Sequence, residues 1–221
     1  MNIAKTIDHT NIDPKATKED IIKTCNEAKK YGFRGVDVNP EWVSLVKEEL
    51  KGTDLKVIVL IDPPMGISPT TERIEMCKEA KENGADEIDI VMNIVAMKHD
   101  KEEDVLKDLK EVCDIAPTKV IIGSGYLTDK EVGKASALVK EAGGICVKTA
   151  TFKDPLDETQ LDKKAEHVRI MSKEASGLLV KASGKISNFK DAMKMIEAGA
   201  DIIGTSSGVD IIKGKEGAVT S

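Results

Sequence analysis

The chain of 221 residues has few aromatic side chains: one Trp, two Tyr and three Phe, or 3% of the sequence. Its core must therefore be built from Ile, Val, Leu, Ala and Met, and Ile/Val-rich cores are typical of buried parallel strands. No run of Lys and Arg is interleaved with aromatic residues, and the formal net charge is −6. We therefore expect no nucleic-acid partner.

Other absences exclude further classes of protein. No hydrophobic run has the length of a membrane span, and residues 1–15 hold no apolar stretch of signal-peptide length. We expect a cytoplasmic protein with no membrane partner. The four cysteines lie far apart with no Cys-x-x-Cys pair, and the three histidines show no metal-ligand spacing. Reduced core thiols and no metal site are the expectation.

What the sequence has instead is a repeated phrase: an amphipathic helix, a glycine, then a short apolar strand. The same helix-to-strand connection predicts tandem αβ units, which build a parallel sheet. No linker of Pro, Gly or Ser interrupts the chain, so we expect one domain over residues 1–221. The phrase occurs at 27–38, 78–91, 139–148 and 195–205.

The pattern predicts eight strands, and eight βα units indicate a TIM (β/α)8 barrel; a doubly wound open sheet is the alternative. Helical patterns fill the gaps, at 17–32, 70–84, 104–116, 128–144 and 188–199. The predicted strands are 6–10, 35–38, 57–61, 87–91, 119–122, 145–149, 178–182 and 201–205.

Two predicted strands carry a lysine where a core strand would hold another Val or Ile. Lys148 follows Gly-Ile-Cys-Val, and Lys181 follows Gly-Leu-Leu-Val. In a barrel both lie near the carboxyl ends of neighbouring strands, where active sites of this fold are found, and Asp89 lies at the equivalent level of the fourth strand. We therefore expect the three side chains to converge. The structural alternative is an ion-pair network, which desolvation makes a poor stabiliser.

Clustered lysines have a chemical use. An amine attacks a carbonyl only when it is unprotonated, and the pKa of a free lysine is about 10.4. Burial and a neighbouring cation both lower the pKa of a lysine, so that it can form a Schiff base with an aldehyde or ketone. We expect one lysine to react and the other to tune it, with Asp89 moving protons. This chemistry needs no metal or other cofactor.

The turns after the last two strands indicate the substrate. Small residues there, in Ser183-Gly184-Lys185 and in the segment 204–208, leave backbone N–H groups open to a ligand. Phosphate sites of TIM barrels are often built from the loops after strands seven and eight. We therefore expect a small phosphorylated carbonyl compound or sugar as the partner molecule.

At these motifs the sequence resembles the deoxyribose-phosphate aldolase family, class I aldolases on a TIM barrel. The resemblance rests on motifs along nearly the whole chain: IDHTNI (7–12), VNPEWV (38–43), GADEIDIVMNI (84–94), KVIIGSGYLTDKE (119–131), VKTATF (147–152), VKASG (180–184) and AGADIIGTSSGV (198–209).

The resemblance implies reversible cleavage of 2-deoxy-D-ribose 5-phosphate into D-glyceraldehyde 3-phosphate and acetaldehyde. It makes Lys148 the Schiff-base lysine, Lys181 the residue that lowers its pKa, and Asp89 the proton donor and acceptor. Asp8 and Lys153 match positions of a supporting proton relay. By the same resemblance, the phosphate is held at Gly184, Gly204, Ser206 and Ser207.

The chain departs from the family's usual pattern at a few positions. Gly123 replaces a Glu, Lys185 replaces a Gly in the phosphate loop, and Asp37 stands where a Cys is frequent. No lysine or carboxylate that the mechanism requires is lost. Lys185 could assist the phosphate directly, which we keep as a hypothesis.

Two rival functions stay open at this stage. One is a Schiff-base barrel aldolase for another small phosphorylated aldehyde or ketone, which only a panel of substrates would separate. The other is a phosphosugar-binding barrel without catalysis. Barrels of this kind often form dimers, so we expect a homo-oligomer, a dimer or higher, although no particular face indicates how it assembles.

Overall fold

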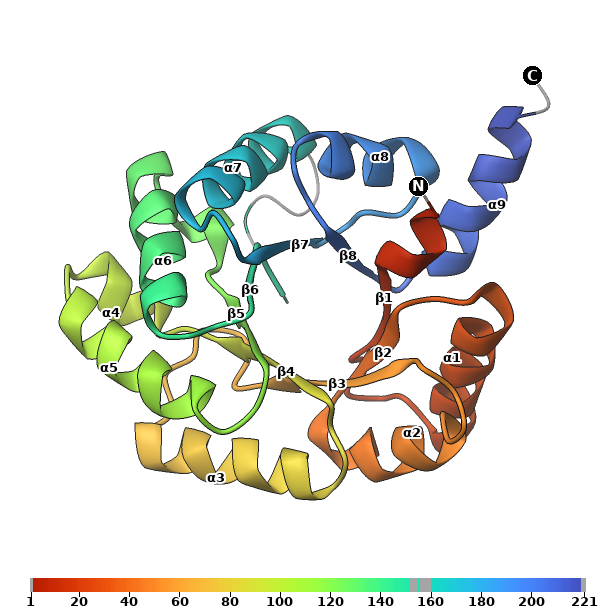
Figure 1. The fold of residues 1–221 in the computed structure, drawn as a ribbon, viewed down its shortest axis with the longest axis horizontal. Coiled ribbons are helices and arrows are strands. Elements are labelled where there is room, and N and C mark those ends of the chain that lie inside the picture. The colour runs from red at the N-terminus through yellow and green to blue at the C-terminus, as the bar shows by residue number, and fades with distance from the viewer. Residues whose placement is uncertain (1, 152–154, 156–159, 220–221) are drawn as a thin grey trace.

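The computed structural model describes residues 2–151, 155 and 160–219, with the side chains of α9 described only as far as residue 214. The strands form a closed parallel barrel in the order β1 to β8, and the helices surround it as an outer ring (Figure 1). Because β8 pairs with β1, the sheet has no edge, and the open-sheet alternative is wrong.

All eight predicted strands are present, each within one residue of its expected ends. They were predictable because most of them follow a helix and a glycine, and because parallel strands buried on both faces are rich in Ile and Val. The strands are β1 (Ile7–Asn11), β2 (Gly35–Val38), β3 (Lys56–Ile61), β4 (Glu87–Val91), β5 (Thr118–Ile121), β6 (Cys146–Lys148), β7 (Leu179–Ser183) and β8 (Ile202–Thr205).

The five predicted helices correspond to α1 (Lys18–Tyr31), α3 (Thr70–Glu82), α5 (Glu102–Cys113), α6 (Asp129–Glu141) and α8 (Phe189–Glu197). Capping boxes at Thr17 and Thr128 begin α1 and α6, with Asp20 and Glu131 closing the reciprocal hydrogen bonds. The other helices are η1 (Ile3–Thr6), η2 (Pro40–Trp42), α2 (Val43–Glu49), α4 (Ile94–Lys98), η3 (Ser124–Tyr126), α7 (Leu161–Glu174) and α9 (Gly208–Val219).

Strand alternation places charged side chains inside the barrel. In β4, Glu87 and Asp89 alternate with Ile88 and Ile90, and all four are buried. Successive strand residues point to opposite faces of a sheet. The isoleucines therefore face the helices and contribute to the hydrophobic core, while the two carboxylates point into the barrel.

Within the described ranges, no helix is long and apolar enough to cross a membrane. The cysteines are free: Cys25, Cys77 and Cys146 are buried and Cys113 is half-buried. Burial raises the pKa of the Cys146 thiol to about 12. The expectation of reduced cysteines packed in the core is confirmed for these three buried residues.

Candidate active site

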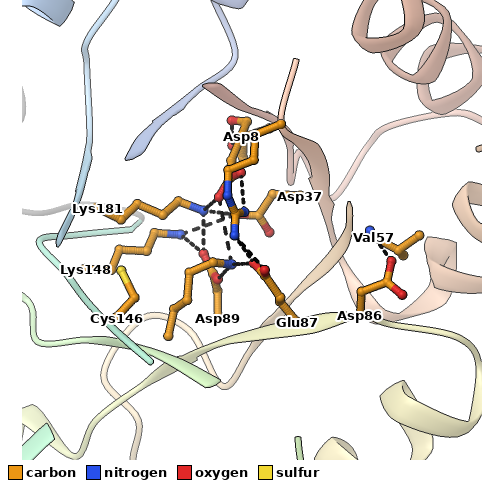
Figure 2. Close-up of polar contacts among 12 residues, drawn as sticks. Asp8, Asp37, Val57, Asp86, Glu87, Asp89, Cys146, Lys148 and Lys181 are labelled. Carbon is orange, nitrogen blue, oxygen red and sulfur yellow. Dashed lines mark hydrogen bonds and ion pairs between the residues drawn. The ribbon is translucent and has the colours of Figure 1, made fainter. Parts of the chain in front are cut away.

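Lys148 and Lys181 are direct partners in the register of β6 and β7. Their Nζ atoms both donate to the same carboxylate oxygen, Asp89 Oδ2, at 2.7 Å each. Figure 2 shows the two lysine side chains running side by side, with Asp89 next to their ends. The structure thus brings together the three residues whose convergence the sequence predicts.

Lys148 differs from Lys181 in its access to solvent. Lys181 and Asp89 are fully buried, whereas Lys148 is 3% exposed and lines a cavity of about 1030 Å³. The cavity lies at the carboxyl ends of the strands, where the loops after β1, β6, β7 and β8 meet. Of these two lysines, Lys148 is therefore the one that a molecule in the cavity can reach.

Asp8, at the second position of β1, also joins this group. Its Oδ2 lies 2.7 Å from Lys181 Nζ, and its Oδ1 accepts a hydrogen bond of 2.8 Å from Arg34. Lys153, the other residue expected in a proton relay, lies outside the described residues.

Three further charged residues, which the sequence analysis did not single out, extend the group towards the amino ends of the strands. Lys119 donates to Asp89 Oδ1 at 2.6 Å and lies 2.9 Å from Glu87 Oε2. One terminal nitrogen of Arg34 donates to both carboxylate oxygens of Glu87, to Oε1 at 2.6 Å and to Oε2 at 2.8 Å. Lys119 repeats the signal of Lys148 and Lys181, a lysine within an apolar strand, and could have been found by it.

Asp37 is a fourth residue that was not among the predicted site residues. Its Oδ2 lies 3.1 Å from Lys181 Nζ and 3.4 Å from Lys148 Nζ. Its other oxygen, Oδ1, is buried and has no hydrogen-bond partner among the described residues. A carboxylate between Val36 and Val38 in a predicted strand was the available signal.

These ion pairs make one charged cluster, which carries no net charge when every member is ionised. Four of its side chains are basic and four are acidic. The charged cluster consists of Asp8, Arg34, Asp37, Glu87, Asp89, Lys119, Lys148 and Lys181.

The cluster fixes the protonation of its central pair. Burial alone would lower the pKa of Lys181, but the carboxylates around it, with Asp8 and Asp89 foremost, raise that pKa well above 10.5. Burial alone would raise the pKa of Asp89, but the lysines around it hold that pKa well below 3.8. In the resting site at neutral pH, Lys181 is therefore held as a cation and Asp89 as an anion.

Asp37 behaves in the opposite way. Burial raises the pKa of Asp37 above 3.8, and although Lys181 opposes this, the negative charge of Asp89 adds to the rise. Of the carboxyl groups around Lys148 and Lys181, Asp37 is the one that accepts a proton most readily.

The four residues expected to hold a phosphate all line the cavity: Gly184, Gly204, Ser206 and Ser207. The loop between β8 and α9 is held in place by Thr205, whose hydroxyl donates to Ile186 O at 2.6 Å and accepts the N–H of Ser207 at 2.9 Å. The first N–H groups of α9 have no partner within that helix, so an anion can use them.

Gly204 has a second role that the sequence did not indicate. A Cβ built on Gly204 would lie 2.3 Å from Ser183 Oγ and 2.8 Å from Lys181 Cε. Only glycine leaves room here for the Lys181 side chain to cross the barrel. The residue thus serves the charged cluster as well as the cavity wall.

The loop beneath the cavity wall is fixed by a buried lysine. Lys164, on α7, donates to Ser183 O at 3.0 Å and to Gly184 O at 2.8 Å. These bonds set the path of the chain after β7. Lys185, which follows, also lines the cavity and has a left-handed backbone with a φ of 55°.

Gly123, where the family usually has Glu, has a left-handed backbone with a φ of 62°. A Cβ there would lie 2.3 Å from Ile94 Cδ1. The departure therefore belongs to local packing after β5. The structure finds no cluster of His, Cys, Asp and Glu suited to a metal ion among the residues that it describes.

Comparisons with known proteins identify the family of the chain. Residues 2–214 match the model of the family described as DeoC/LacD family aldolase. A protein of Thermococcus gammatolerans named deoxyribose-phosphate aldolase is 47% identical over 226 residues, which cover 99% of this chain and 98% of that protein. One of the same name from Methanothermobacter thermautotrophicus is 45% identical over 96% of this chain and 94% of its own length.

A solved structure from Aeropyrum pernix, described as a tetrameric deoxyribose phosphate aldolase, superposes with a TM-score of 0.87 at 28% identity, over 98% of this chain and 92% of that one. The likeness thus extends from the sequence to the closed barrel and runs along almost the full length of both chains. We conclude that the chain belongs to the DeoC/LacD aldolase family and is an aldehyde-lyase.

Proposed function

We propose that this protein cleaves 2-deoxy-D-ribose 5-phosphate reversibly into D-glyceraldehyde 3-phosphate and acetaldehyde, through a Schiff base on Lys148. The observation that carries the proposal is the position of Lys148: it lines the cavity, while its partner Lys181, bonded to the same oxygen of Asp89, is sealed beneath it. The relatives named deoxyribose-phosphate aldolase support the choice of substrate.

The Lys181 ammonium shares one carboxylate oxygen with Lys148, and two ammonium groups on one oxygen repel each other. The reaction uses Lys148 as the free amine. The free amine attacks C1 of the open-chain sugar, and loss of water leaves a protonated imine. Removal of the proton on the C3 hydroxyl then breaks the C2–C3 bond, whose electrons move towards the imine nitrogen. Glyceraldehyde 3-phosphate departs, and C2 takes up a proton before water releases acetaldehyde.

Asp89 moves the protons of the cleavage itself, away from the C3 hydroxyl and on to C2, because its Oδ2 already lies beside the reacting amine. A carboxylate held between two lysines orients both of them and balances the positive imine as it forms. Asp8 holds Lys181 from the opposite side, at 2.7 Å, and so fixes the distance between the two amines.

The phosphate lies at the cavity wall formed by the loops after β7 and β8, against Gly184, Ser206 and Ser207. This position suits a dianion, because the amino end of α9 has a partial positive charge and its first N–H groups have no partner within the helix. Lys185 supplies a positive side chain at the same wall. The sugar then spans from this wall to Lys148.

The decisive experiment is reduction with borohydride in the presence of deoxyribose 5-phosphate, followed by peptide mapping. A covalent adduct on Lys148 is expected, with full activity in EDTA. Lys148→Ala should lose nearly all turnover, and Lys181→Leu should form adduct slowly and only at high pH. An adduct on another lysine would contradict the assignment.

A panel of phosphorylated aldehydes and ketones tests the substrate separately from the lysine chemistry. Preference for another member of the panel would assign the protein to a different Schiff-base aldolase activity. Saturable binding without turnover or trapping would indicate a binding protein.

The assembly is a homo-oligomer, for which the tetramer described for the Aeropyrum pernix relative is the support. Light scattering after size exclusion measures the mass, and a monomer at micromolar concentration would contradict this part of the proposal. The cellular location is cytoplasmic, in keeping with the absence of a membrane-crossing helix from the described residues; fractionation of cells tests it.

A further inference from the structure

Lys148 must lose a proton before it can attack a carbonyl, and two carboxylates lie within reach of its Nζ. Asp89 Oδ2 is 2.7 Å away and Asp37 Oδ2 is 3.4 Å away. The nearer group is the poorer acceptor. Asp89 Oδ2 also accepts from Lys181, at 2.7 Å, and its Oδ1 accepts from Lys119, at 2.6 Å, so both of its oxygens are held by cations.

Asp37 is held less tightly by its neighbours and can accept a proton. Its Oδ2 is shared between two lysines at longer distances, and its Oδ1 is buried without a partner among the described residues. A buried carboxylate oxygen with no hydrogen bond is costly, and the cost is relieved when the group is protonated. The position of Asp37 therefore suits a carboxyl group that takes up a proton and gives it back.

We propose that Asp37 is a catalytic acid–base residue of this enzyme, which accepts the proton that Lys148 loses and returns it to the oxygen that leaves as water. The inference rests on the proposed Schiff-base function. It assigns a role to a side chain that stands where the family's usual pattern has a Cys.

The charge of the cluster supports this assignment. When the proton moves from Lys148 to Asp37, one cation and one anion disappear together, so the buried cluster stays neutral. Any solvent acceptor would leave a net negative charge inside the barrel, which is unfavourable in a medium of low dielectric constant. Burial raises the pKa of Asp37 above 3.8, in agreement with a group that is ready to bind a proton.

The steps balance. The Lys148 ammonium gives one proton to the Asp37 carboxylate, and the free amine forms a C–N bond with the aldehyde carbon of the substrate. A proton shifts from that nitrogen to the alkoxide oxygen, giving a carbinolamine. Asp37 then protonates the hydroxyl, the C–O bond breaks, water leaves, and the nitrogen lone pair completes the protonated imine. Asp37 ends as a carboxylate, as it began.

The groups that surround Asp37 come from five other strands, so its titration reflects the whole cluster. The two lysines of β6 and β7 contact it directly. The charged groups on the strands around it are Asp8, Glu87, Asp89, Lys119, Lys148 and Lys181, with Arg34 preceding its own strand.

The test is the rate at which the Lys148 adduct forms in a single turnover with deoxyribose 5-phosphate, quenched with borohydride at several pH values. Asp37→Asn keeps the shape of the side chain but cannot accept a proton. At pH 7 we expect adduct formation to slow by about 10²-fold or more. The rate in this variant should then rise about tenfold per pH unit, because hydroxide must remove the proton, while the wild-type rate stays nearly flat.

Two further variants complete the design. Asp86→Asn makes the same change in a carboxylate outside the cluster, which binds Val57 N–H and Lys47, and should leave the rate unchanged. Asp37→Cys places a titratable thiol in the same position and should recover part of the rate lost in Asp37→Asn. Asp37→Cys also replaces Asp37→Asn as the test if the Asn variant does not fold. The rate of adduct formation in Asp37→Cys should lie below that of the wild type and rise with pH.

The outcomes separate the inference from the function on which it rests. An unchanged rate and pH profile in both Asp37 variants would overturn the role of Asp37 and leave the aldolase proposal intact. A wild-type protein that forms no adduct on Lys148 would overturn the proposed function first.

Discussion

Lys181 passes across Gly204 so closely that a Cβ on residue 204 would lie 2.8 Å from Lys181 Cε. The two residues lie on neighbouring strands, β7 and β8, and the lysine reaches Asp8 and Asp89 only through the space that the glycine leaves. A backbone position that looks like part of a phosphate loop in the sequence is therefore also a packing requirement of the charged cluster.

Replacing Gly204 with Ala should move Lys181 and Ser183 and so impair catalysis. We expect a loss of stability of about 1–3 kcal/mol from overpacking and a fall in kcat of about 10²-fold, since small misplacements of catalytic groups have effects of that size. Gly133→Ala is the matched control, because its Cβ would lie 3.5 Å from the nearest atom. Equal kcat values in the two variants would disprove the packing argument.

Lys119 is fully buried and balances Asp89 and Glu87. Lys119→Met removes a positive charge next to those two buried carboxylates. We therefore expect the free energy of unfolding to fall by about 3–5 kcal/mol. Urea unfolding measures it. The control is Lys78→Met, which removes a surface pair with Glu75 and should change stability by less than about 0.5 kcal/mol. Similar losses in both variants would show that the cluster does not depend on Lys119.

Stability should be highest over a plateau in pH. The cluster holds the pKa values of Asp8 and Asp89 below 3.8 and that of Glu87 below 4.5, so their contribution is complete above those values and is lost as pH falls through the folded-state pKa values. The pKa values of Lys119 and Lys181 lie above 10.5, so their contribution is complete below that value and is lost at higher pH.

The contribution of Asp37 to stability depends on pH in the opposite direction, because its raised pKa makes its ionisation unfavourable in the folded state. Its contribution is complete below pH 3.8 and declines as pH rises through the folded-state pKa. Asp37→Asn should therefore be more stable, relative to wild type, at pH 7 than at pH 3. Thermal melts from pH 2 to 11 measure both effects. Maximum stability below pH 4 would be incompatible with the ion-pair assignment.

Lys185 combines a strained backbone with a positive charge at the cavity. Lys185→Gly relieves the left-handed strain and should raise stability by about 1 kcal/mol, whereas Lys185→Ala should not. Both variants should raise KM for deoxyribose 5-phosphate by about fivefold, the equivalent of 1 kcal/mol, and leave KM for unphosphorylated deoxyribose unchanged. An unchanged KM for the phosphorylated sugar would remove Lys185 from the phosphate site.

The strands were predictable because most units repeat the same order of helix, glycine and apolar run. Strand count alone favoured a closed barrel, but closure depends on the pairing of β8 with β1, which no local pattern encodes. Helix α7 was not predicted, since its buried face includes Lys164 and His167 and so lacks a clean apolar stripe.

The central residues of the site were predictable because a charge within an apolar strand is costly. Lys119 and Asp37 carry the same signal as Lys148, Lys181 and Asp89 but are not among the predicted site residues. The side chain that each charge meets across the barrel could not be predicted, because strands far apart in sequence supply the partners. Asp37 and Lys148 are 111 positions apart.

The ion pairs of Arg34 with Glu87 and Asp8 fill the barrel on the amino-terminal side of Lys148, so the cavity at the opposite end is the route by which molecules reach that lysine. In the proposed reaction, the two-carbon fragment stays bonded to Lys148 after C2–C3 cleavage, and the phosphorylated fragment lies between it and solvent. We therefore expect sequential departure, with glyceraldehyde 3-phosphate first and acetaldehyde last. Product-inhibition kinetics would accordingly show acetaldehyde competing with the sugar phosphate for free enzyme.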